Sequence, residues 1–576
     1  MRVRLDRYLP GIQVARSYER SWVRPDLIAG VVLTALLVPQ GMAYAQLAGL
    51  PPVTGLYATV LALVAYAIVG PSRTLILGPD STLSPLVFAA VAPLVAVDAP
   101  PSERVVYAAM LALLMGVLCI AAGVLRLGVL AELLSMPMRV GYLNGIAIVV
   151  LVSQLPKLCG FSTGAEGAID EARAFVDGVA NGQTDATALA IGVACLAVII
   201  VARQVDPRIP GVLIAVVGAT LTVGLFDLQA SGVPVVGAVP AGFPRPDWPG
   251  VSLEDTWTLL VAAFGMAFIT IADTVALSRT FAERGAAVDA DQEIVALGAA
   301  NAAAGLFQGF PLSASSSRTA VATATGARSQ LTGIVGAAGI LVLLVFANDA
   351  TQDLPQASLA AVVIAASFGL FDVASLVRLF RVRSSEFLLA ILTTAGVVVV
   401  GVLQGIAIAA ALSLANFVRR AWRPYNVVLG RIDGRKGYHD VERHPEARQI
   451  PGLILFRFDA PLFFANAQYF ADRLDEIVSR RNEPVRRVIV AAEPISDIDT
   501  TAADALDVLI DDFARRGIDL VFAELKGPVK DRLARYGLAA KIGEKGFPPT
   551  LGTAIDAYLQ DSGVVWVDWE DRPPAS

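Results

Sequence analysis

The chain has 576 residues, of which 55% are hydrophobic and only 17% are charged, and its mean hydropathy is +0.63. Soluble globular proteins have about 25% charged residues, so this composition indicates a membrane protein with several spans. The net charge is −6 and the basic stretches are short, which excludes nucleic acid as a partner. The two histidines, His439 and His444, lie outside the apolar segments, which excludes a histidine proton relay inside the membrane.

The ends of the chain differ in composition from its middle. The first 24 residues carry six arginines and lack an early apolar run, so we predict a cytosolic segment at 1–24 and no cleavable signal peptide. A membrane domain is predicted at 25–418, followed by a linker at 419–450, a soluble domain at 451–562 and a tail at 563–576. Arginines flank the first and the last apolar stretch, so both termini are predicted to lie in the cytosol, with the protein in the inner (plasma) membrane.

The membrane domain is predicted to hold about fourteen spans, at roughly 20 residues for a complete span and fewer for a broken one. The candidates are 27–47, 54–69, 83–97, 105–125, two spans within 127–158, 188–201, 210–226, 257–277, 294–307, 314–325, 331–346, 357–371, 387–402 and 406–418. A stretch rich in proline and glycine, 232–255, is predicted to be the external loop that joins two halves of about seven spans each.

Two segments interrupt the apolar pattern at corresponding places in the two halves. LILGPDSTLSPL (75–86) falls at the third span of the first half, and GFPLSASSSRTAVATATG (309–326) at the third span of the second. Paired interruptions of this kind indicate inverted repeats with a binding site near the bilayer midplane. Two helices would then begin inside the membrane with their N-termini facing each other. Unpaired backbone N–H groups and the helix dipole favour an anion at such ends.

The residues of these segments suit an anion. The hydroxyl donors that we predict for the site are Ser81 and Thr82 in the first segment and Ser315, Ser317 and Thr319 in the second. Arg318 adds a positive charge, and because an arginine at mid-bilayer costs at least about 2.5–3.5 kcal/mol, it should face a cavity or a partner. The alternative is that the small residues only allow helices to pack closely.

Two carboxylates lie in otherwise uncharged apolar segments. Asp273 either binds Na+ or H+ and couples that ion to the substrate, or neutralises Arg318. Asp80 either caps its half-helix by accepting a backbone N–H, which we favour, or also serves as a counter-charge to Arg318.

The soluble domain shows three β-like runs, 452–459, 485–493 and 518–526, with helical patterns between them, which predicts an α/β domain. Thr500 or Thr501 can provide a hydroxyl as helix N-cap or phosphate acceptor, and we favour the cap. This domain has no visible set of nucleophile, base and orienting residue, so we do not predict an enzyme.

Several of these motifs together resemble a known family. VPQGMAYAQLAGLPPVTGLYA, GPDSTLSPL, DTVALSRTFAERGAAVDADQEIVALGAAN and SASSSRTAVATATGARSQLTG follow one another across the membrane domain as they do in the SulP anion transporters. The stretch from IPGLILFRFDAPLFFANAQYF to LKGPVKDRLARYGL is similar to a STAS domain. The resemblance implies a seven-plus-seven inverted repeat like that of uracil permeases, with core and gate domains and elevator-like movement. It also implies a homodimer to which the STAS domains contribute.

The resemblance also implies site residues. It places the anion site at Gln40 and Tyr44 of the first span, at Gly78, Asp80 and Ser81 of the first half-helix, and at Ser315, Ser317 and Arg318 of the second. The acidic residue of the eighth span is commonly glutamate in bacterial relatives and is Asp273 here, which leaves the coupling ion open. We assign Asp273 and Leu277 to the site of that ion.

The function expected from residues and resemblance together is secondary active transport of a small inorganic anion, coupled to H+ or Na+. Sulfate is the first expectation and bicarbonate the second, and dicarboxylates and chloride stay open. No cofactor is expected beyond the coupling Na+ or H+, and the partners are the anion, membrane lipid and a cytosolic protein that binds the STAS domain. The alternatives are a proton-coupled uracil permease, a channel, and a membrane sensor that signals through the STAS domain.

Overall fold

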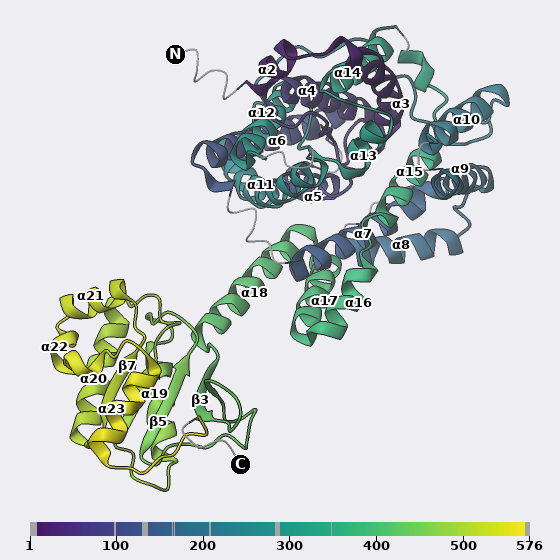
Figure 1. The fold of residues 1–576 in the computed structure, drawn as a ribbon. Coiled ribbons are helices and arrows are strands. Elements are labelled where there is room, and N and C mark those ends of the chain that lie inside the picture. The colour runs from purple at the N-terminus through teal and green to yellow at the C-terminus, as the bar shows by residue number, and fades with distance from the viewer. Residues whose placement is uncertain are drawn as a thin grey trace. The chain divides into compact units, whose positions relative to one another are not determined.

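The structure is a computed structural model that describes residues 9–96, 99–128, 136–163, 165, 167–206, 209–282, 288–346 and 348–570. The chain divides into two compact units, Met1–Ser413 and Leu414–Ser576. The first unit is helical and the second combines a sheet with helices (Figure 1). Seven helices are long and apolar enough to cross a membrane, and four shorter apolar helices accompany them among the described residues.

The first half of the membrane unit contains seven consecutive elements that follow the short N-terminal helix α2 (Pro10–Arg16). They are α3 (Val23–Leu47), α4 (Pro52–Val69), β1 (Leu77–Gly78) with α5 (Ser84–Val91), α6 (Pro101–Val124), α7 (Met136–Leu158), α9 (Ala186–Val205) and α10 (Gly211–Leu225). A further helix, α8 (Ala168–Ala180), lies between the fifth and sixth elements.

The second half repeats this order. Its elements are α11 (Leu253–Phe281), α12 (Ala290–Leu306), β2 (Ser313–Ala314) with α13 (Ser316–Ala324), α14 (Leu331–Phe346), α15 (Gln356–Phe368), α17 (Ser384–Val399) and α18 (Val402–Trp422). The extra helix α16 (Val373–Val382) again lies between the fifth and sixth elements.

Contacts between helices follow the symmetry of an inverted repeat. The first element of each half packs on the fourth element of the other half, as α3 does on α14 and α11 on α6. The fifth element of each half packs on the sixth of the other half, as α7 does on α17 and α15 on α9. The third elements, β1 and β2, pair with each other in antiparallel orientation. The predicted seven-plus-seven fold is therefore confirmed.

The helices of the membrane unit gather into two bundles, which Figure 1 shows as separate groups of ribbons. We call the first, built from α3 to α6 and α11 to α14, the core bundle. The second, built from α7 to α10 and α15 to α17, is the gate bundle. The core bundle packs tightly through glycines: a Cβ added to Gly55 would lie 1.9 Å from the Gly41 carbonyl oxygen, and one added to Gly298 would lie 2.7 Å from the Gly116 carbonyl oxygen. These glycines therefore allow the helices of the core bundle to pack closely.

Two features of the membrane unit differ from the sequence prediction, and the predicted loop 232–255 agrees with the structure up to Ser252. The stretch 127–158 was predicted to hold two spans, but its described residues form one helix, α7, and residues 129–135 lie outside the described part. Helices α8 and α16 were not predicted, because short amphipathic helices do not stand out in hydropathy. The predicted loop 232–255 has no helix before Leu253, and its backbone N–H groups at Val236 and Gly242 donate to carbonyls at the ends of neighbouring elements.

The soluble unit has a five-stranded sheet in the order β4-β3-β5-β6-β7. Its strands are β3 (Asn426–Arg431), β4 (Tyr438–Asp440), β5 (Leu453–Phe458), β6 (Arg487–Ala491) and β7 (Asp519–Ala523). Strands β5, β6 and β7 are parallel and match the three predicted runs, whereas β3 runs antiparallel to both of its neighbours. Strands β3 and β4 lie in the stretch assigned from sequence to a linker, and the domain bounds given there stay a prediction.

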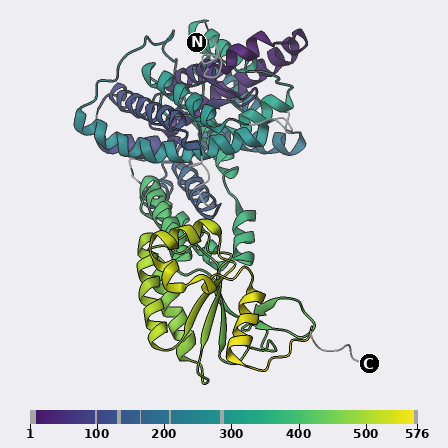
Figure 2. The same cartoon turned by 60° about the vertical axis from the view of Figure 1, so that its left-hand side comes forward.

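Helices cover both faces of this sheet (Figure 2). One face packs against helices α19 (Ala467–Ser479), α20 (Thr500–Arg515), α21 (Gly527–Arg535) and α22 (Leu538–Ile542), and the other against α23 (Leu551–Ser562). The prediction that a threonine hydroxyl caps α20 is wrong. The N-cap residue is Asp499, whose carboxylate accepts the Ala502 N–H at 2.8 Å, while Thr500 and Thr501 are exposed. A carboxylate one residue earlier already satisfies the N–H that a hydroxyl would have accepted.

Candidate anion-binding site

The two interrupted segments meet where strands β1 and β2 form a two-stranded antiparallel sheet, a place that we call the crossing. Leu77 of β1 pairs with Ala314 of β2, and Gly78 pairs with Ser313. Each strand leads within a few residues into a short helix, β1 into α5 and β2 into α13. Because the strands are antiparallel, the two half-helices leave the crossing in different directions, and their N-terminal ends both lie at it. The structure therefore brings together the two helix starts that the sequence predicted to face each other.

Helix α13 begins after a buried serine, and serines that are exposed occupy its first two positions. Its N-cap residue is Ser315, whose Oγ accepts a long hydrogen bond of 3.5 Å from the Arg318 N–H and lies 3.3 Å from the Ser317 Oγ. Ser317 is exposed, whereas Thr319 is fully buried and its Oγ1 accepts the Ile76 N–H at 3.0 Å. The hydroxyls of Ser315 and Ser317 thus lie together at the N-terminal end of α13, whereas that of Thr319 links α13 to the segment before β1.

The side chain of Arg318 is buried at the crossing, with an exposed fraction of 1%. Its Nη2 donates to the carbonyl oxygens of Gly78 at 3.1 Å and Pro79 at 2.6 Å. Its Nε and Nη1 have no hydrogen-bond partner among the described residues. Leaving a buried charged donor unpaired is costly, and a planar guanidinium matches the oxygens of an oxyanion. An anion at this place would satisfy both free N–H groups.

Neither of the two carboxylates forms an ion pair with Arg318. Within the described part of the chain, the contacts of Asp80 are to hydroxyls and one backbone N–H, and those of Asp273 are to helix α7. Asp80 nevertheless acts electrostatically on Arg318, so its role as a counter-charge stays open. Because no carboxylate of the described residues forms an ion pair with the guanidinium, its unpaired N–H groups are available to a ligand.

The first half-helix presents fewer free donors than the sequence predicted. The carboxylate of Asp80 accepts the hydroxyls of Ser313 at 2.8 Å, Thr82 at 2.9 Å and Ser81 at 3.2 Å. A hydroxyl has one proton to donate, so Ser81 and Thr82 are engaged by Asp80 in this structure. The assigned helix α5 begins at Ser84 with Leu83 as its N-cap residue, but Asp80 accepts the Thr82 N–H at 3.4 Å with its carboxylate and the Ser84 N–H at 3.0 Å with its carbonyl. The favoured role of Asp80 as a cap therefore stays a prediction, and its carboxylate also links the turn after β1 to β2.

Gly78 approaches the arginine closely. A Cβ built on Gly78 would lie 2.6 Å from the Nη1 of Arg318, closer than real Cβ contacts allow. The lack of a side chain at this position is therefore what lets the guanidinium lie against the β1 backbone.

Replacing Gly78 with alanine should lower anion uptake by about tenfold to 100-fold, because displacing a binding group by about 1 Å has effects of this size. Uptake by reconstituted protein measures this. The matched control is Gly218→Ala in α10, where an added Cβ meets no atom within 4 Å. Equal uptake by both variants would contradict the role of Gly78.

Helix α3 contributes the two residues predicted from the first span. Gln40 and Tyr44 are both buried, with exposed fractions of 7% and 5%. The Oε1 of Gln40 has no hydrogen-bond partner in the described structure, and Tyr44 lies within electrostatic range of Asp80 and Arg318. Because α3 also packs on α5 and α13, all three predicted parts of the site come together.

Asp273 lies apart from this group and contacts the gate bundle. Its Oδ2 accepts the hydroxyl of Tyr142 at 2.8 Å, and its Oδ1 lies 3.1 Å from the Nη2 of Arg139. Arg139 and Tyr142 both belong to α7 and were missed from sequence, where the start of this helix could not be placed. Leu277 lies one turn beyond Asp273 in the uninterrupted helix α11, with its side chain packed against the apolar core.

Comparison with known proteins decides the family. Residues 23–393, more than half of the chain, match the sulfate permease family. The chain belongs to this family. Residues 444–554 match the STAS domain, so the predicted pairing of a sulfate permease membrane domain with a STAS domain is confirmed.

Other members of the sulfate permease family are similar along most of their length. A probable sulfate transporter of Mycobacterium tuberculosis is 41% identical over 552 residues, which cover 96% of this chain and 98% of the relative. The chloroplastic sulfate transporter 4.1 of Arabidopsis thaliana is 30% identical over 577 residues, which cover 96% of this chain and 83% of the relative. The protein is accordingly an anion transporter with several membrane spans, and not an enzyme.

Solved structures show the same fold. The murine anion transporter Slc26a9, in its inward-facing state, superposes with a TM-score of 0.88 at 22% identity, covering 97% of this chain and 95% of that one. The transmembrane domain of a cyanobacterial bicarbonate transporter, BicA, superposes with a TM-score of 0.59 at 21% identity, covering 69% of this chain and 97% of that one. At these identities the likeness concerns the fold alone.

Proposed function

We propose that this sulfate permease family member is a secondary active transporter of sulfate. The observation that carries the proposal is the buried guanidinium of Arg318, whose Nε and Nη1 are unpaired at the N-terminal end of α13. Sulfate offers several acceptor oxygens and two negative charges, which suit these donors, the Ser315 and Ser317 hydroxyls and the helix dipole. The names of the relatives in Mycobacterium tuberculosis and Arabidopsis thaliana support the same substrate.

The test is uptake of labelled sulfate into proteoliposomes, with bicarbonate and a dicarboxylate as competitors. We expect saturable sulfate uptake that excess unlabelled sulfate abolishes and that bicarbonate reduces only at much higher concentration. Bicarbonate uptake without sulfate uptake would overturn the proposal in favour of a bicarbonate carrier. If neither anion enters the vesicles, a dicarboxylate carrier or a sensor that acts through the STAS domain becomes the better explanation.

We also propose that the protein moves sulfate by elevator-like movement of the core bundle against the gate bundle, driven by H+ or Na+ bound at Asp273 and Leu277. The anion-site residues Gln40, Tyr44 and Arg318 all belong to the core bundle, so they can move together as one body. Asp273 is on the same bundle but contacts α7 of the gate bundle, which places an ionisable group where the two bundles meet. We further propose a homodimer in the inner (plasma) membrane with cytosolic termini.

Replacing Asp273 with asparagine should abolish the dependence of uptake on the driving cation while sulfate binding persists. An amide binds Na+ weakly and takes up no proton near neutral pH, so an inward Na+ or H+ gradient would no longer drive uptake. The measurement is uptake with and without inward Na+ and H+ gradients, with Asp170→Asn on the exposed face of α8 as the control. Persistent stimulation by the gradient in the Asp273 variant would contradict the coupling role.

A further inference from the structure

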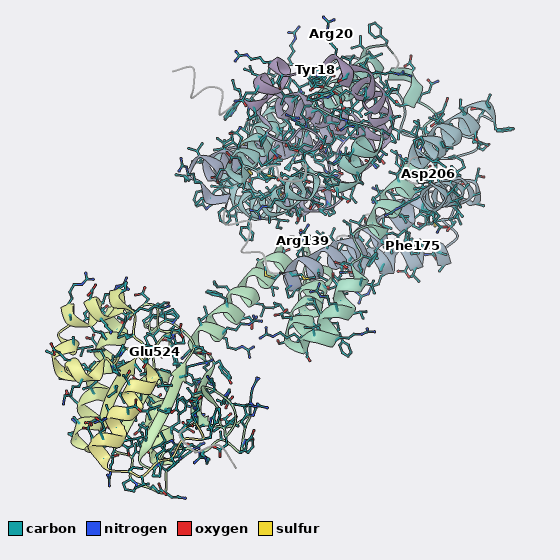
Figure 3. All side chains as sticks on the ribbon, viewed as in Figure 1. Tyr18, Arg20, Arg139, Phe175, Asp206 and Glu524 are labelled. Atoms are coloured by element: carbon teal, nitrogen blue, oxygen red, sulfur yellow. The ribbon has the colours of Figure 1, made fainter. Side chains whose placement is uncertain are left out.

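The contact between Asp273 and Arg139 joins two bundles that an elevator mechanism requires to move apart. Asp273 lies on α11 of the core bundle, and Arg139 and Tyr142 lie on α7 of the gate bundle. Figure 3 labels Arg139 at the start of α7, where this helix approaches the core bundle. Movement of one bundle along the other separates the 3.1 Å ion pair and the 2.8 Å hydrogen bond together. These contacts therefore belong to one conformational state of the transport cycle.

Both partners of Asp273 come from the same face of α7. The first of them along the helix is Arg139. Tyr142 follows three residues later, so both side chains lie on the same face of α7 and reach the same carboxylate. The Arg139 side chain is 40% exposed and that of Asp273 only 16%. The arginine is thus the more exposed partner of the pair, and the carboxylate is the more enclosed one.

The Asp273 carboxylate is only partly satisfied by these partners. Its Oδ1 is within ion-pair distance of Arg139 but makes no hydrogen bond to any described residue. The charged and titratable groups that act on Asp273 are Arg139 and Tyr142 from α7 and Asp80 from the turn after β1. Asp80 adds a second negative charge nearby, which favours a cation at Asp273 once Arg139 has left.

We propose that Arg139 is the positioning residue that occupies Asp273 in this conformation and competes with the coupling cation for it. The inference rests on the proposed coupling at Asp273 and adds the order of events. A proton or Na+ binds the Oδ1 of Asp273, the ion pair with Arg139 breaks, and the core bundle becomes free to move. After the core bundle has returned and the cation has dissociated, the ion pair with Arg139 forms again.

Cation binding to the full-length protein in detergent tests this competition without requiring transport. The readout is the unfolding temperature, titrated once with Na+ at constant pH and once with protons at constant Na+. Arg139→Gln should lower the half-saturating cation concentration by about tenfold or more, because an adjacent opposite charge changes carboxylate affinities by this amount. Arg139→Lys, which keeps the charge, should stay near the wild-type value. Asp273→Asn should remove the cation response, with or without Arg139→Gln.

Arg383→Gln is the matched control, because Arg383 pairs with Glu386 at 3.3 Å entirely within the gate bundle and should leave the cation titration unchanged. The proposal is overturned if Arg139→Gln binds the cation as the wild type does, or if it shifts the titration equally when Asp273 is already asparagine. A protein that transports sulfate without any cation dependence refutes the proposed coupling. If the cation binds at Asp273 with a half-saturating concentration that does not depend on Arg139, this inference alone is refuted.

Discussion

Replacing Arg318 with glutamine should reduce sulfate affinity by about 100-fold, because truncating one partner of a buried, charge-assisted pair commonly has an effect of this size. Arg318 supplies the only full positive charge among the predicted anion-site residues, and two of its N–H groups are unpaired in the described structure. Glutamine removes the charge but can still donate to a carbonyl of the β1 segment. Equilibrium binding of sulfate to purified protein, measured calorimetrically, gives the affinity directly.

Two further variants separate charge from geometry at this position. Arg318→Lys keeps the charge but cannot direct two N–H groups at one anion while also donating to Gly78 and Pro79, so we expect an intermediate affinity. Arg318→Ala should lose stability as well as affinity, because the side chain is buried and its two carbonyl partners would be left without a donor. Sulfate affinity that is unchanged in all three variants would remove Arg318 from the site.

The parts of the fold that depend on local sequence were predictable. Glycine, proline and hydroxyl residues within apolar stretches mark where a span breaks, so the half-helices α5 and α13 and their matching positions could be found. The three parallel strands of the soluble unit were found because each is a short apolar run between turns. Arg318 stood out because a charge in an apolar segment requires an explanation.

The parts that depend on distant partners were not predictable. Ser81 and Thr82 were expected to donate to a ligand, but their hydroxyls donate to the Asp80 carboxylate instead. The same carboxylate accepts the hydroxyl of Ser313 from the other half of the chain. The role of Arg139 could not be predicted, because its partner Asp273 is brought to it only by the meeting of two bundles. Strand β3, NVVLGR, is a short apolar run that lies in the stretch assigned from sequence to a linker, and it pairs with β4 and β5.

Helices α8 and α16, which were not predicted from sequence, occupy equivalent places in the two halves. Each follows the fifth element of its half, so the two helices are equivalent, yet their sequences share no motif. Their charges also differ: α8 carries Asp170, Glu171 and Asp177, whereas α16 carries Arg378 and Arg381. The two helices thus occupy the same place in the repeat although their side chains carry different charges.

Replacing Asp26 with asparagine should lower the free energy of unfolding of the membrane unit by about 3 kcal/mol, because at least two buried donors lose their acceptor. Asp26 lies in the first turn of α3 and is fully buried. Its carboxylate accepts the N–H groups of Arg328 at 2.6 Å and Ser329 at 3.1 Å. It also accepts the hydroxyls of Ser329 at 2.6 Å, Tyr18 at 3.0 Å and Thr332 at 3.1 Å. An amide nitrogen cannot accept any of these hydrogen bonds.

The inverted repeat offers a control for this prediction. Asp255 lies in the first turn of α11, at the corresponding place in the second half, but it is only partly buried, and within the described structure its carboxylate accepts the hydroxyls of Tyr107 and Ser252. Denaturant or thermal unfolding in detergent should therefore show a much smaller loss for Asp255→Asn than for Asp26→Asn. Equal losses of unfolding free energy would mean that the donors around Asp26 form hydrogen bonds to water in the variant. A large loss for Asp26 alone would show that the segment between α13 and α14, and with it the half-helix that carries Arg318, is held in place by a carboxylate on α3.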